Sequence, residues 1–392
     1  MHQQTTRFAK RTQWSLAPNR ISGLLEKLRE AHQEIIDLTE SNPTHCGFDY
    51  PTNRILESLA KKENLDYLPS AQGMKTAREA VCAYYAKKNF SVDPDQIFLT
   101  ASTSESYSFL FRLLANPGEN ILFPRPSYPL FEFLVDLNDL VSSTYPLTYD
   151  RQWKIEVPKM SLALSDETKA IVLVNPNNPT GSFVKTKELE AINALCRQKD
   201  LALISDEVFF DYPFQKNSEA VSLINNTQTL TFVLGGLSKA LALPQMKLSW
   251  IVVSGPKGQT EEVGKRLELI ADTYLSVNTP TQNALSDWFV FLPEIQDQIL
   301  KRIQHNRALL KKFFQDELLE ADGGWYMVIR FPGVVGEEDF VYELLEKDHV
   351  FVHPGYFFDF EEEFHLVICL LQKPEIFEAG LIKISERIRK WK

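Results

Sequence analysis

The chain has 392 residues, of which 44% are hydrophobic and 24% are charged, and its net charge is −10. This length and composition are typical of a globular protein with two domains rather than one simple core. The negative charge argues against a general nucleic-acid-binding surface. No apolar run approaches the about 18 residues that a membrane-spanning helix needs.

The cysteines and the N-terminus indicate a cytoplasmic protein. Cys46, Cys82, Cys196 and Cys369 form no C-x-x-C pair, and no histidine cluster lies near them. We therefore expect neither a disulfide framework nor a metal site, and the pattern favours a reducing compartment. Residues 1–7 are polar and no apolar segment follows them, so we predict no signal peptide.

The N-terminal part is predicted to be a polar arm followed by a helix. Residues 1–20 form the arm, and residues 21–49 form an N-terminal segment that packs with the smaller of two domains. Apolar positions at helical spacing predict a helix over 22–36. A polar loop that ends in Asn42-Pro43-Thr44 follows this helix.

The middle of the chain predicts a large α/β domain over residues 50–275. Continuous apolar runs alternate there with helical segments, which is typical of a mostly parallel sheet covered by helices on both faces. The predicted strands are 96–100, 120–123, 170–174, 201–204, 229–234 and 248–253. Residues 276–392 are predicted to form a smaller α+β domain, with helices at 282–314 and 337–348 and strands at 323–330 and 364–370.

Lys239 lies where α/β proteins gather their active sites. The β-rich run Thr229–Leu234 ends in Gly235-Gly236, and the lysine follows at once, at the carboxyl end of a predicted strand. Partial desolvation there favours the neutral amine, which can form a Schiff base with an aldehyde. Most lysines after a strand are solvated surface residues, so this pattern alone does not identify a site.

Two further motifs follow predicted strands. The turn Asn175–Gly181 is rich in proline and asparagine and can hold the Asn178 amide toward a ligand. Asp206 follows the strand 201–204, and a carboxylate at a buried strand end needs a cation, such as a protonated pyridine nitrogen. Taken alone, such an aspartate is more often a helix cap.

In order and spacing these residues resemble the class I/II aminotransferases of pyridoxal phosphate (PLP) fold type I, which are aspartate aminotransferase-like. Asp206 lies 28 residues after Asn178, and Lys239 lies 33 residues after Asp206. The resemblance covers about residues 37–370. It implies a large, mostly parallel sheet domain covered by helices plus a smaller α+β domain, pyridoxal 5'-phosphate as the cofactor, and amino-group transfer from an amino acid or amine to a 2-oxo acid.

The resemblance also implies a role for each site residue. Lys239 would hold PLP as an internal aldimine and then act as acid and base, Asp206 would bind the pyridine nitrogen, and Asn178 the phenolic oxygen. An aromatic ring would stack on the cofactor, and polar residues would surround its phosphate. These expected cofactor contacts are Tyr128, Ser102, Thr103, Ser104, Ser238, Lys247 and Tyr67.

The same resemblance implies a homodimer and a substrate site. Tyr67 would reach the phosphate of the neighbouring subunit. The loop at Asn42 would close over the substrate. Together with Asn178 and His365, Asn42 makes up the expected substrate contacts.

Three departures from the family pattern affect the cofactor site. Gly236 replaces a phosphate-binding serine or threonine, although Ser238 lies nearby. Lys247 replaces an arginine and lacks its bidentate fork. Phe209 replaces a tyrosine, so one hydrogen bond to the phenolic oxygen is lost.

A fourth departure concerns the substrate. The arginine that grips the α-carboxylate is replaced by His365 or Val367, depending on register. We expect a relocated cation, with Arg330, Arg125 and Arg20 as candidates. Otherwise the substrate is an amine whose carboxylate is remote or absent.

Two alternatives to an aminotransferase stay open from the sequence. The same fold supports other PLP chemistry, such as a C–S β-lyase or a decarboxylase, because the cofactor supplies the chemistry and the site selects the bond. A non-catalytic PLP-binding regulatory module is the other alternative. Retention of Lys239, Asp206 and Asn178 argues against it, because a scaffold needs no base.

Overall fold

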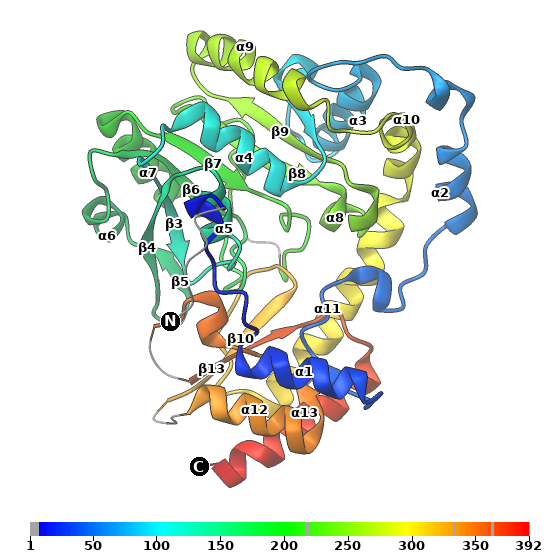
Figure 1. Cartoon of the computed structure of the whole chain (residues 1–392), viewed down its shortest axis with the longest axis vertical. Coiled ribbons are helices and arrows are strands. Elements are labelled where there is room, and N and C mark those ends of the chain that lie inside the picture. The colour runs from blue at the N-terminus through cyan, green and yellow to red at the C-terminus, as the bar shows by residue number, and fades with distance from the viewer. Residues whose placement is uncertain (1–7, 216–218, 333, 335, 362–363, 392) are drawn as a thin grey trace.

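The computed structural model describes residues 8–215, 219–332, 334, 336–361 and 364–391. Its centre is an eight-stranded sheet with the order β2-β9-β8-β7-β6-β3-β4-β5, in the upper part of Figure 1. Neighbours from β8 to β4 pair in parallel, while β2, β9 and β5 pair antiparallel. The strands are β2 (Ile97–Thr100), β3 (Asn120–Arg125), β4 (Val141–Tyr149), β5 (Trp153–Ile155), β6 (Thr168–Val174), β7 (Ala202–Asp206), β8 (Thr231–Gly236) and β9 (Ser249–Ser254). The predicted mostly parallel α/β sheet is confirmed.

Helices cover both faces of this sheet. Along β8, Phe232 and Leu234 belong to one buried apolar cluster and Val233 belongs to another, so successive side chains enter two cores. The first cluster includes residues of α4 (Thr103–Leu114), α5 (Phe131–Leu137) and α9 (Lys257–Tyr274). The second includes residues of α3 (Lys75–Ala86), α6 (Val157–Leu162) and α7 (Thr186–Lys199). Burial on both faces explains why the strand sequences are continuously apolar.

The C-terminal part contains a second, smaller sheet, in the lower part of Figure 1. Its antiparallel order is β10-β13-β12, and a separate parallel pair joins β1 to β11. These strands are β1 (Ile36–Asp37), β10 (Tyr326–Phe331), β11 (Val350–Phe351), β12 (His353–Pro354) and β13 (Phe364–Cys369). The helices nearby are α1 (Arg20–Glu30), which packs on α12 (Glu337–Asp348), and α13 (Pro374–Trp391), which packs on α11 (Leu292–Phe314).

Short elements complete the chain. The remaining α-helices are α2 (Thr52–Leu59), α8 (Leu237–Ala240) and α10 (Thr279–Trp288), and α10 packs on α2 and α3. The 3-10 turns are η1 (Lys10–Thr12), η2 (Pro43–His45), η3 (Lys62–Leu65), η4 (Pro94–Gln96), η5 (Pro244–Met246), η6 (Phe289–Phe291) and η7 (Gly355–Phe358). Among the helices of the described residues, none is long and apolar enough to span a membrane. The domain boundaries at 49/50 and 275/276 stay a prediction.

Two predicted helices are wrong in extent. The helix expected over 22–36 ends at Glu30, because His32 adopts a left-handed conformation with φ of 54°, and the chain then enters β1. The helix expected over 282–314 is divided by η6 into α10 and α11. Pro293 opens α11, and its missing N–H cannot continue a preceding helix.

Gly235 lets β8 approach β9 closely, just before Lys239. A Cβ there would lie 2.5 Å from Nε1 of Trp250, which is fully buried and donates to the Tyr85 hydroxyl. Gly235→Ala should therefore lower the free energy of unfolding by about 1–3 kcal/mol through overpacking, measured by urea denaturation. Gly264→Ala in α9 is the control, because an added Cβ there would meet no described atom within 4 Å apart from the nearby backbone of its own helix, and it should be neutral or stabilising by up to about 1 kcal/mol. Equal losses in both variants would contradict this account.

Candidate active site

A cavity of about 300 Å³ lies at the carboxyl ends of β6, β7 and β8. The strands are in register there, with Val174 opposite Asp206 and Asp206 opposite Leu234. This is the edge of a parallel sheet where ligands bind. The cavity is lined by Ser41, Ser102, Thr103, Ser104, Tyr128, Phe131, Val174, Asn178, Asp206, Val208, Phe209, Ser238, Lys239, Pro244 and Tyr326.

Lys239 lies in α8, which follows β8 directly. This helix has only four residues, so its carbonyl groups need partners outside it. The hydroxyl of the buried Tyr212 donates to the Lys239 carbonyl at 2.6 Å, and the Gln296 amide donates to the Ala240 carbonyl at 3.0 Å. Burial lowers the pKa of the Lys239 amine to about 8, although the nearby Asp206 carboxylate opposes this shift. The lysine is thereby fixed in position and readily deprotonated.

Asp206 ends β7 beside Lys239. Its Oδ1 accepts from the Val208 N–H at 3.2 Å, and its Oδ2 accepts from the Tyr107 hydroxyl at 3.0 Å. Burial raises the pKa of Asp206 to about 6, although both hydrogen bonds and the Lys239 charge oppose this shift. The site therefore holds a carboxylate that a cationic ligand group would stabilise.

Asn178 and Tyr128 face the same cavity. The Asn178 side chain is 8% exposed, and its Oδ1 has no hydrogen-bond partner among the described residues. A hydrogen bond holds the start of the turn that carries Asn178, since Asn175 Oδ1 accepts from the Val184 N–H at 2.9 Å. Burial raises the pKa of Tyr128, with the Asp206 charge as a second cause, so the phenol lies near that carboxylate. Both side chains are available to a ligand.

Four of the expected phosphate contacts come together and two do not. Ser102, Thr103 and Ser104 line the cavity at the start of α4, and Ser238 lines it from α8. Lys247 is exposed and lies outside the lining. Tyr67 is 76% exposed and borders a separate pocket, so a single chain does not bring it to the site.

The expected substrate contacts are only partly assembled. Asn178 lines the cavity, but Asn42 and His365 do not, while Ser41, next to Asn42, does. His365 lies buried in β13, where its ring stacks on Phe360 at 4.4 Å and its backbone N–H donates to Glu337 at 2.7 Å. In this register the His365 side chain packs on Phe360 and does not line the cavity.

None of the three candidate arginines lines this cavity. Arg20 pairs with Asp339, and Arg125 pairs with Glu361 and donates to the Asp359 carbonyl at 3.1 Å. Arg330 lies 5.6 Å from the centre of the Tyr149 ring. Among the described lining residues, Lys239 is the one lysine or arginine.

Several residues of the candidate site were not predicted from the sequence. The Tyr107 hydroxyl donates to Asp206, while Ser41 and Tyr326 line the cavity. Trp325 packs against the Lys239 amine. Tyr107 lies on the same face of α4 as Thr103, four residues away, and this spacing could have indicated that Tyr107 faces the site. The others come from segments far away in the chain, which only the fold brings together.

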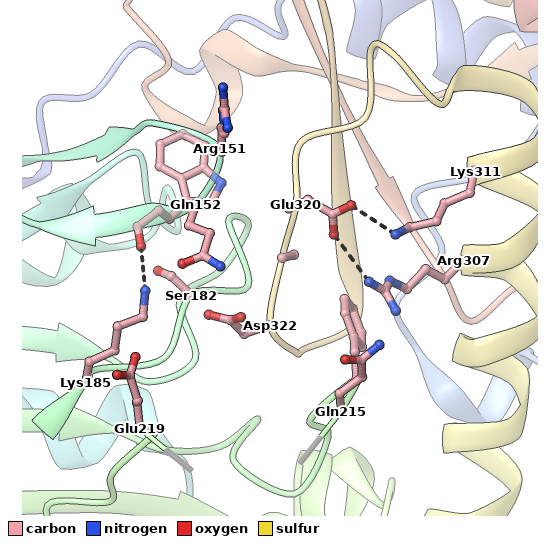
Figure 2. Close-up of a pocket in the computed structure, with 13 residues that line it drawn as sticks. Arg151, Gln152, Ser182, Lys185, Gln215, Glu219, Arg307, Lys311, Glu320 and Asp322 are labelled. Carbon is pink, nitrogen blue, oxygen red and sulfur yellow. Dashed lines mark hydrogen bonds and ion pairs between the residues drawn. The ribbon is translucent and has the colours of Figure 1, made fainter. Parts of the chain in front are cut away.

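A second cavity, of about 470 Å³, lies between residues 151–219 and residues 307–322 and is drawn in Figure 2. Three of its charged side chains pair with one another: Glu320 accepts from Lys311 at 2.9 Å and pairs with Arg307 at 3.4 Å. Lys185 donates to the Trp153 carbonyl at 3.3 Å. None of the predicted site residues lines this cavity, so it is not the candidate active site.

Comparison with known proteins identifies the family. The family model "Aminotransferase class I and II" matches residues 33–379, which is most of the chain. The chain belongs to the class I and II aminotransferases. The glutamate-pyruvate aminotransferase of Haemophilus influenzae is 26% identical over 374 residues, covering 92% of both chains. The tyrosine aminotransferase of Mus musculus is 24% identical over 412 residues, covering 97% of this chain and 88% of that one.

The solved structures agree on the fold of this aminotransferase. The alanine aminotransferase from Pyrococcus furiosus superimposes with a TM-score of 0.87 at 24% identity, covering 98% of this chain and all of that chain. An aminotransferase from Escherichia coli gives a TM-score of 0.82 at 23% identity, covering 95% of both chains. The predicted family, PLP fold type I and aminotransferase activity are confirmed. The lyase, decarboxylase and regulatory alternatives find no support in these relatives.

The raised pKa of Asp206 predicts a pH-dependent cost to stability. Without a cationic ligand, the stability contributed by this group is full below about pH 4 and is lost as the pH rises through about 6. Asp206→Asn should therefore raise the free energy of unfolding of the cofactor-free protein by about 1–2 kcal/mol at pH 8, and by less at pH 4. Denaturant titration at both pH values measures this.

The matched control is Asp272→Asn, on the exposed face of α9, which should change stability little at either pH. An Asp206→Asn gain that is as large at pH 4 as at pH 8 would show that burial of the charge is not its cause.

Proposed function

We propose that this aminotransferase binds PLP through the Lys239 amine and uses the same amine to move the proton on Cα of an amino donor. The convergence of Lys239, Asp206 and Asn178 on one cavity carries this proposal. No other described cavity gathers a lysine, a carboxylate and an amide at the ends of three adjacent parallel strands.

The cavity residues fit PLP chemically. Burial raises the pKa of Asp206, and a protonated pyridine nitrogen beside it would stabilise the charged carboxylate. Asn178 lines the cavity, and its Oδ1, which has no partner among the described residues, can accept a hydrogen bond from a bound group. Backbone N–H groups at the start of α4, at Thr103 and Ser104, suit a phosphate.

Bound PLP supplies an electron sink that makes the Cα–H of the donor acidic. Lys239 Nζ would accept this proton and return it, and a pKa of about 8 suits both directions near neutral pH. Asp206 would keep the proton on the ring nitrogen, with Tyr107 and the Val208 N–H holding the carboxylate in place. Tyr128 would cover one face of the ring.

The substrates in this proposal are an amino acid or amine and a 2-oxo acid. The names of the relatives make glutamate, alanine and tyrosine the first donors to test. The hydroxyls of Ser41 and Tyr326 can donate neutral hydrogen bonds to the donor.

The proposal extends to a homodimer and to the cytoplasm. Tyr67 is 76% exposed, and in a dimer it would contact the phosphate of the partner subunit. A cytoplasmic setting accords with the four cysteines, which are all free thiols.

We expect turnover by the PLP-loaded protein to require both an amino donor and a 2-oxo acid such as 2-oxoglutarate. Lys239→Ala should lower kcat by about 10²–10⁴-fold or more, because the proton-transfer group is removed, and Asp206→Ala should retain some PLP but lose most activity. Product amino acid and product oxo acid are measured together. Release of pyruvate or carbon dioxide without a 2-oxo acid would make the enzyme a lyase or decarboxylase instead.

A donor panel with α-amino acids and simple amines defines the substrate class in the same assay. Arg20→Ala, Arg125→Ala and Arg330→Ala serve as controls, and each should leave KM unchanged within about twofold, because these residues lie outside the cavity. A tenfold rise in KM for α-amino acids in one variant would identify that arginine as the relocated carboxylate partner. Turnover of simple amines alone would mark an amine transaminase.

A further inference from the structure

The Lys239 amine lies over two aromatic rings. Its Nζ is 4.6 Å from the centre of the Trp325 ring and 5.2 Å from that of Phe209. The two rings pack edge to face, with their centres 5.3 Å apart. Both are buried, Trp325 completely. We call Phe209 and Trp325 the aromatic pair.

The aromatic pair is held rigidly from two parts of the chain. Phe209 lies in the turn that follows Asp206, the last residue of β7 in the large sheet. Trp325 directly precedes β10 of the small sheet. The Trp325 carbonyl accepts from the Leu370 N–H at 2.8 Å, and its ring packs on Tyr212 at 5.2 Å. Tyr212 in turn donates to the Lys239 carbonyl. The same contacts therefore fix both the lysine backbone and the surface beneath its amine.

Within the described part of the chain, no carboxylate forms an ion pair with the Lys239 amine alone. The titratable groups that act on it are Asp206, at the end of β7, and Cys369, at the end of β13. In the proposed function Asp206 serves the ring nitrogen, and burial keeps the Cys369 thiol protonated by raising its pKa. An aromatic face attracts an ammonium through its quadrupole without forming an ion pair that would immobilise the lysine.

We infer that Phe209 and Trp325 are positioning residues that hold the Lys239 ammonium beside the cavity whenever the amine is not bonded to the cofactor. The importance of this role for catalysis rests on the proposed function of Lys239. Because Trp325 belongs to the small-sheet region, the protonation of Lys239 depends on how this region packs against the large sheet.

The sign of one pKa change tests the inference. Trp325→Leu removes the aromatic face and should lower the pKa of Lys239 by about half a pH unit or more. A purely space-filling tryptophan predicts the opposite, because a smaller side chain admits water, which relieves desolvation and raises the pKa. Trp325→Phe keeps a ring and should retain most of the value.

The measurement is competitive labelling with acetic anhydride over a range of pH, on the full-length protein freed of cofactor, with the Lys239 peptide quantified by mass spectrometry. Lys88, which lies over Tyr84 and pairs with Asp211, is the internal control, and its labelling should be the same in every variant. Phe209→Leu is the second variant if Trp325→Leu does not unfold cooperatively. An unchanged or raised Lys239 pKa in the aromatic-to-leucine variant overturns the inference.

The loaded enzyme provides a second readout. The limb of the kcat–pH profile that reports Lys239 should move in the same direction and by a similar amount in Trp325→Leu, with KM for the donor changed less than twofold. A loss of kcat with an unmoved profile would assign Trp325 to packing alone. The labelling experiment needs no turnover. It can therefore contradict the role of the aromatic pair while the proposed function is still supported, so the two claims are tested separately.

Discussion

The site depends on the parallel pairing of β6, β7 and β8. In this register Val174, Asp206 and Leu234 lie side by side, so the three chains leave the sheet at the same level. Backbone hydrogen bonds continue the pairing one residue further, from the Asn175 N–H to the Asp206 carbonyl at 2.8 Å and from the Glu207 N–H to the Leu234 carbonyl at 3.0 Å. A shift by one residue would turn Asp206 to the opposite face of the sheet. The two hydrophobic cores that fix this register therefore also fix the chemistry.

Burial at this edge acts on the two charged groups in opposite directions. It lowers the pKa of Lys239 to about 8 and raises that of Asp206 to about 6. Burial therefore disfavours the charged form of both groups, and in the proposed function a different part of one ligand would interact with each: an aldehyde with the amine and a cationic ring with the carboxylate.

Much of the fold could be predicted because its central strands are buried on both faces. Such strands are continuously apolar and end in recognisable turns, as at Asn175–Gly181 and Gly235-Gly236. The strand β4 (Val141–Tyr149) was missed because it begins with Val-Ser-Ser-Thr and lies near the sheet edge, where polar side chains are tolerated. The long C-terminal helix α13 was also not predicted.

The residues of the candidate site that follow strands could be predicted from the local sequence. Those that only tertiary packing brings to the site were missed. Lys239, Asp206 and Asn178 each follow a strand, so their convergence follows from the sheet. Tyr107 and Trp325 act through tertiary contacts that no spacing in the sequence reveals. Depending on register, His365 or Val367 was expected to replace the carboxylate-binding arginine, and the ring of His365 stacks on Phe360. Contacts expected from Lys247 and Tyr67 are not made within one chain.

The central claim is that Lys239 is the residue that carries PLP. Reduction of the PLP-loaded protein with borohydride, followed by digestion and mass spectrometry, tests it directly. The account predicts a yellow protein in which the cofactor mass is fixed on the peptide that contains Lys239, and no fixation on this peptide in Lys239→Ala. Fixation on another lysine, or no bound PLP at saturating cofactor, would contradict it.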